Sequence, residues 1–115
     1  MGKPLILYLV IEESAIGAML AQEGEARAEH TVYYLSKKML PYEIKYSQVE
    51  HICLVMVWTM IKLRHYFQSY KIRAISKLDL MRHLFEAPSL VGKLSKWIIL
   101  LTEFDIEYWT KKIVK

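Results

Sequence analysis

The chain has 115 residues, a length that fits one domain of common size. Hydrophobic residues make up 54% of it and charged residues 24%, so it can bury a core and contains no segment of disordered composition. The net charge of +4 permits nucleic-acid binding without requiring it, because scattered basic residues also suit a plain solvated surface. The high apolar fraction indicates that a partner, or further chain, covers part of the surface.

A single cysteine, Cys53, lies within an apolar run, so no disulfide can form within the chain. A buried core thiol is its expected role, since no histidine is placed to activate it. The longest strongly apolar stretch, Ile52 to Ile61, is about half as long as a bilayer span requires. Two glutamates follow the apolar run Leu5 to Ile11 without a cleavage site, which argues against a signal peptide. We therefore expect an intracellular protein, cytoplasmic or nuclear, that is not secreted and does not enter a membrane.

The first part of the chain predicts three short strands. Leu5 to Ile11 is a continuous apolar run of strand length, and Ala15 to Ala21 is apolar again after a polar break. Thr31 to Leu35 is rich in β-branched and aromatic residues. The polar segment Gln22 to Glu29 holds Gly24 and is typical of a hairpin loop, so the three strands are predicted to form an antiparallel meander.

A long helix is predicted next. Ser36 to Lys45 is expected to be a polar connection, and Ser47 with Glu50 three residues later completes a capping box. The helix is predicted to run from about Gln48 to Tyr66. Its apolar residues recur at three- and four-residue steps and mark one buried face: Val49, Ile52, Cys53, Met56, Met60, Leu63 and Phe67.

The second half of the chain predicts two strands and two helices. Alternation indicates a strand over Tyr70 to Ser76, and a short helix over Leu78 to Phe85 is expected to end before Pro88. A further helix is predicted over Leu90 to Leu101, and a final strand over Phe104 to Trp109. The order β-β-β-α-β-α-α-β predicts an α/β fold with a five-stranded mixed sheet flanked by helices. The long helix would cross over to a strand parallel to the first.

Seven segments, taken in order, carry a resemblance to a known family. They are PLILYL from Pro4, AIGAML from Ala15, VYYLSKKML from Val32, YSQVEHICLVMVW from Tyr46, KLRHYFQ from Lys62, LMRHLF from Leu80, and KLSKW with LTEFDIEY up to Tyr108. The chain resembles the ribonuclease H-like domain that follows the polymerase in reverse transcriptases of gypsy-class (LTR) retrotransposons, most of all the plant forms. The resemblance implies one ribonuclease H-like domain over residues 1–115, truncated so that its C-terminal helix is missing.

The resemblance also implies an activity, the cutting of the RNA strand of an RNA–DNA hybrid by two Mg²⁺ ions held by four acidic residues. Magnesium requires such carboxylates because it prefers hard oxygen ligands. Three of the acidic positions fall on Val10, Ile52 and Lys77, and the fourth belongs to a C-terminal segment that this sequence lacks. No catalytic, cofactor-binding or metal-binding residue is therefore predicted, and we expect no bound Mg²⁺.

Nearby acids are poor replacements for the missing ligands. Glu12, Glu50 and Asp79 each lie two positions from a vacated site. Two residues correspond to about 6.6 Å along a strand and to about 200° around a helix. Metal ligation tolerates errors of only about 0.2 Å. We therefore expect structural roles: Glu12 in a turn, Glu50 as a capping residue and Asp79 at the start of the short helix.

Basic residues supply the candidate contacts to nucleic acid, which a solvated basic face explains equally well. The main candidates are Lys37, Lys38, Lys45 and Arg64, with Lys62 and Lys71 as further possibilities. The leading hypothesis is an inactive domain with a structural or weak nucleic-acid-binding role, whose partners are the polymerase part of its polyprotein and an RNA–DNA hybrid. Two alternatives stay open: the parent polyprotein is an active reverse transcriptase and ribonuclease H, or the sequence is a genomic relic without function.

Overall fold

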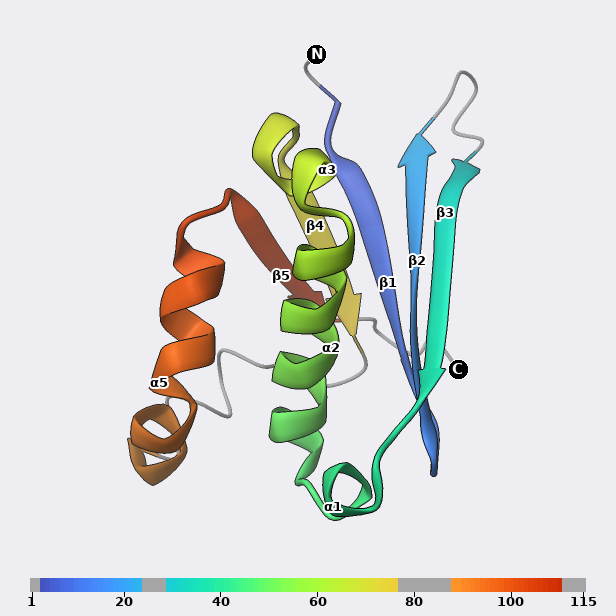
Figure 1. The fold of residues 1–115 in the computed structure, drawn as a ribbon. Helices are drawn as coiled ribbons and strands as arrows, with labels where there is room; N and C mark the ends of the chain where they lie inside the picture. Colours follow the sequence, from blue (N-terminus) through green and yellow to red (C-terminus); the bar gives the residue numbers. More distant parts are fainter. Residues whose placement is uncertain (1–2, 24–28, 77–87, 111–115) are drawn as a thin grey trace.

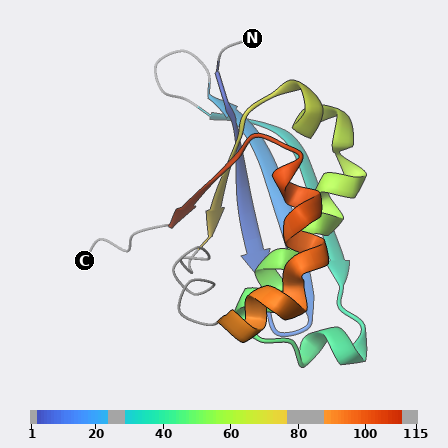
Figure 2. The same ribbon diagram turned by 90° about the vertical axis from the view of Figure 1, so that its left-hand side faces the viewer.

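The computed structural model describes residues 3–23, 29–76 and 88–110. They form a five-stranded sheet with its helices packed against one face (Figures 1 and 2). The strand order is β3-β2-β1-β4-β5. The strands are β1 (Leu5–Ile11), β2 (Ala15–Glu23), β3 (Glu29–Lys38), β4 (Ile72–Ser76) and β5 (Ile106–Thr110).

The pairing of the strands makes the sheet mixed, which confirms the predicted architecture. β1 pairs antiparallel with β2 and parallel with β4, while β2 pairs antiparallel with β3 and β4 parallel with β5. All five predicted strands exist. β2 and β3 extend beyond their predicted bounds, because their ladder continues to the pair Glu23 and Glu29 at one end and includes Lys37 and Lys38 at the other.

The helices are α1 (Pro41–Ile44), α2 (Gln48–Lys62), α3 (Arg64–Ser69) and α5 (Pro88–Thr102). The predicted polar connection was wrong in part, since it contains the end of β3 and the short helix α1. Pro41 occupies the first turn of α1, where its fixed φ and missing N–H are compatible with a helix. The predicted helix over Leu78 to Phe85 lies outside the described residues. Within the described ranges, no helix is long and apolar enough to cross a membrane.

The long helix begins where the sequence predicts and ends earlier. The Ser47 side chain accepts a hydrogen bond from the Glu50 N–H at 3.3 Å, and the Glu50 carboxylate accepts one from the Ser47 N–H at 3.0 Å, which confirms the capping box. At Leu63 the backbone leaves the helical region (φ −120°, ψ 37°), and α3 follows directly. The prediction of one helix to Tyr66 was therefore wrong, although the apolar face continues through Leu63 and Phe67.

The hydrophobic core lies between the helices and one face of the sheet. All seven residues of the predicted apolar face of α2 and α3 are buried in it. Leu94 and Leu101 of α5 are also buried, with Trp97 and Ile98 packed against them. From the strands, the core takes Leu5, Leu7, Ile16, Ala18, Leu20, Ile72 and Ala74.

Alternation along β1 divides its side chains between the two faces of the sheet. Leu5, Leu7 and Leu9 belong to or pack against the core beneath the helices. Tyr8 and Val10 therefore point to the opposite face, since successive side chains of a strand alternate. No helix of the described residues lies on that opposite face (Figure 2), which we call the open face.

Several elements end together at one edge of the molecule, which we call the α1 end. The carboxyl end of β1, the turn into β2, the carboxyl end of β3, helix α1 and the start of α2 meet here (Figure 1, lower part). The Met39 N–H donates a hydrogen bond to the Ser14 carbonyl at 2.8 Å, which ties the β1–β2 turn to the segment entering α1. This end contains the positions at which the resemblance places the first two acidic ligands.

Candidate functional site

Val10 lies near the carboxyl end of β1, directly opposite Gly17 of β2. Its side chain is 39% exposed and lies outside the core cluster, on the open face. A valine offers no oxygen to a metal ion. This position therefore presents an apolar, half-exposed side chain where a magnesium site would need a carboxylate.

Ile52 lies in the second turn of α2 and is only 2% exposed. It belongs to the core cluster, so its side chain packs between the helix and the sheet. Val10 therefore lies on the open face of the sheet, whereas Ile52 lies in the buried core. Lys77, the third position, lies outside the described residues. In the part of the chain that is described, no group of three or more His, Cys, Asp or Glu side chains could hold a metal ion.

The acidic residues close to Val10 and Ile52 in the sequence have structural roles. Glu12 is exposed in the β1–β2 turn, where its N–H donates a hydrogen bond to the Ala15 carbonyl at 2.8 Å. Glu50 is buried and forms its half of the capping box with Ser47. These positions agree with the turn and capping roles expected for them. Asp79 falls outside the described residues.

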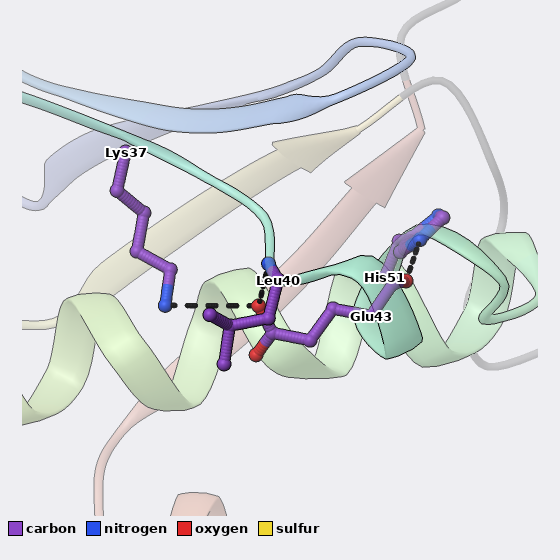
Figure 3. Close-up of polar contacts among 4 residues, drawn as sticks. All are labelled: Lys37, Leu40, Glu43 and His51. Carbon is purple, nitrogen blue, oxygen red and sulfur yellow. Dashed lines mark hydrogen bonds and ion pairs between the residues drawn. The ribbon is translucent and has the colours of Figure 1, made fainter.

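Glu43 is a buried carboxylate that the sequence reasoning missed. Its Oε1 accepts a hydrogen bond from the Leu40 N–H at 2.8 Å and lies 4.0 Å from the Lys37 ammonium (Figure 3). Its backbone carbonyl accepts a 2.7 Å hydrogen bond from Nε2 of His51, which is also buried (Figure 3). This network joins β3, α1 and α2. An acid three residues after Leu40 and just beyond Pro41 was the sequence signal for a helix start.

The predicted nucleic-acid contacts divide into two groups. Lys37, Lys38 and Lys45 lie at the α1 end, where Lys37 also sits 5.8 Å from the ring centroid of Trp58. Arg64 begins α3 at the opposite end of the 15-residue α2, a separation of about 22 Å along the helix axis (Figure 1). The three lysines therefore share one end of the molecule, with Lys37 and Lys38 on opposite faces of β3, and Arg64 lies apart from them.

Arg64 lines an open cavity of about 510 Å³ between α3 and the segment that joins α5 to β5. Its guanidinium lies 6.0 Å from the ring centroid of Phe104. Lys71 adds a second positive charge to the cavity wall, and Glu103 and Asp105 add two negative ones. The balanced charge gives this cavity no preference for an anionic ligand such as a phosphate.

A second polar cluster lies on the open face of β4 and β5. Glu107 is 3.3 Å from the Lys71 ammonium and accepts a 3.3 Å hydrogen bond from the Trp109 indole N–H. Nε of Arg73 lies 3.5 Å from the Glu107 carboxylate, a separation of ion-pair rather than hydrogen-bond character, since Nε makes no hydrogen bond. The hydrogen bonds from Lys71 and Trp109, with the charges of Lys71 and Arg73, lower the pKa of Glu107.

The cysteine has the role that the sequence predicts. Cys53 is buried in the core, and burial, with a smaller contribution from the Glu50 charge, raises the pKa of its thiol to about 11. Burial also raises the pKa of the Tyr108 hydroxyl to about 12, with Cys53 as a second cause. Both groups therefore stay neutral at physiological pH, and Cys53 is a core thiol rather than a nucleophile.

Comparison with known families identifies the chain. Residues 1–104 match the family described as the RNase H-like domain found in reverse transcriptase, and the chain belongs to that family. Its relatives include the retrovirus-related Pol polyprotein from transposon 297 of Drosophila melanogaster, 29% identical over 108 residues. The transposon Tf2-3 polyprotein of Schizosaccharomyces pombe is 26% identical over 110 residues.

The chain is much shorter than these relatives. Each match covers 92% of this chain, yet only 10% of the Drosophila polyprotein and 8% of the yeast polyprotein. The chain therefore corresponds to one domain-sized part of a transposon polyprotein.

Solved structures share the fold. A foamy viral protease-reverse transcriptase in complex with double-stranded DNA superposes with a TM-score of 0.76 at 18% identity, covering 99% of this chain and 20% of that one. The foamy viral protein in complex with an RNA/DNA hybrid gives a TM-score of 0.72 at 17% identity, covering 99% of this chain and 16% of that one. At such identities the likeness concerns the fold, and it confirms the predicted ribonuclease H-like architecture.

Proposed function

We propose that this domain can no longer cleave the RNA strand of an RNA–DNA hybrid. It would instead serve a structural or weak nucleic-acid-binding role within a retrotransposon reverse transcriptase polyprotein. The observation that carries the proposal is the pair Val10 and Ile52, one an apolar side chain on the open face and the other packed in the core. Neither can ligate Mg²⁺, and the sequence has Lys77 at the third position. The residues present do not fit a two-metal site, so these positions supply no ligands for metal-assisted hydrolysis.

The finer placement of the domain is also a proposal. The transposon relatives support a retrotransposon origin. The seven ordered sequence segments support a gypsy-class, plant-type element in particular. We further propose that residues 1–115 form a single domain and that the protein is intracellular, for which its single, reduced core cysteine is the support.

The proposed partners are the polymerase part of the same polyprotein and an RNA–DNA hybrid. Support for the first comes from relatives that are much longer polyproteins. Support for the second comes from the shared fold with a foamy viral reverse transcriptase solved with such a hybrid. In this chain the exposed Lys38 and Lys45 at the α1 end are the candidates for contacts with its phosphates.

Binding and cleavage of one labelled RNA–DNA hybrid test this proposal. We expect no product with Mg²⁺ or Mn²⁺, together with salt-sensitive binding that persists in EDTA. Lys45→Glu should weaken that binding, whereas Arg64→Glu, the same charge change at the far end of α2, should weaken it less. Metal-dependent product, or equal sensitivity to both variants, would count against the proposal.

The second candidate function is membership of a polyprotein whose reverse transcriptase and ribonuclease H are active. The observation in its favour is that the relatives are about ten times longer than the matched region, so activity could reside elsewhere in the parent protein. Sequencing the flanking regions and assaying the longer protein tests it. Hybrid cleavage by the longer protein, and not by this domain, would support this second candidate.

A further inference from the structure

We draw no further inference here: the strongest candidate, the surface patch of exposed apolar side chains at helix α1 (Leu40, Tyr42 and Ile44), carries nothing because nothing in the structure shows what covers it.

Discussion

The backbone carbonyl of Glu43 and the Nε2 of His51 are joined by a 2.7 Å hydrogen bond that ties α1 to α2. The side chain of the same glutamate accepts the Leu40 N–H at 2.8 Å. Both polar residues are buried, so the segment between β3 and α2 is held by hydrogen bonds within a largely apolar setting. This segment positions the start of α2 and, with it, Ile52.

Replacement of Glu43 by alanine is therefore expected to lower the free energy of unfolding by about 1–3 kcal/mol, because the Leu40 N–H loses its acceptor. Lys37→Met removes an ion pair at 4.0 Å, whose lysine side chain is one-third exposed, and a cation–π contact with Trp58 at 5.8 Å. Together these should cost no more than about 1 kcal/mol. Urea unfolding of the two variants measures both values. A larger loss from Lys37→Met than from Glu43→Ala would contradict this account of the α1 segment.

Restoring acids at the vacated positions should have unequal costs. Val10→Asp places a carboxylate on a half-exposed strand site and should destabilise by about 1 kcal/mol. Ile52→Glu buries a carboxylate among apolar side chains and should destabilise by about 4 kcal/mol or more.

Ile52→Val is the control for the core position, and its expected cost is about 0.5–1.5 kcal/mol. Thermal unfolding of the three variants distinguishes the sites. If the Ile52→Glu variant were as stable as the Val10→Asp variant, the Ile52 side chain would not be packed in the core as we describe.

The carboxylate of Glu107 should make a small contribution to stability that depends on pH. Its pKa is lowered in the folded chain, chiefly by the hydrogen bond from Lys71 and then by that from Trp109. Its contribution is therefore complete above the ordinary glutamate pKa of 4.5 and is lost as the pH falls through the lower, folded-state pKa. Glu107→Gln should reduce the loss of melting temperature at acid pH in a plot of melting temperature against pH. An unchanged loss in Glu107→Gln would show that the carboxylate is not held by these neighbours.

Cys53 should resist thiol reagents while the chain is folded. Its buried thiol has a pKa raised to about 11 from an ordinary value of 9.0, so little thiolate exists at pH 8. The group stabilises the folded state fully below pH 9, and this contribution is lost as the pH rises toward 11. Reaction with an aromatic disulfide reagent at pH 8 should be slow without urea and fast in it. Rapid reaction of the folded protein would mean that the thiol is accessible.

The sequence predicted the parts of the fold in which local pattern and tertiary packing agree. β1 has the predicted bounds because its apolar run is uninterrupted, and α2 begins at Gln48 because Ser47 and Glu50 cap it. The break at Leu63 was not predictable from periodicity, since the apolar face continues into α3 and neither glycine nor proline marks it. Helix α1 was missed because Pro41 suits both a loop and a first helical turn.

The candidate sites were predictable to different degrees. Val10 and Ile52 came from the resemblance, and alternation along β1 was needed to place Val10 on the open face. The contacts among Arg73, Glu107 and Trp109 depend on the register of two parallel strands more than 30 residues apart in the chain, which no local pattern specifies.

The most direct test of the central claim is incubation of the purified domain with a labelled RNA–DNA hybrid in Mg²⁺, in Mn²⁺ and in EDTA. We predict no metal-dependent product at any protein concentration at which the hybrid is bound, because Val10 and Ile52 provide no oxygen ligand. Cutting that requires metal, disappears in EDTA and is lost in Glu12→Gln or Glu50→Gln would contradict the account and would place the metal site on the displaced acids.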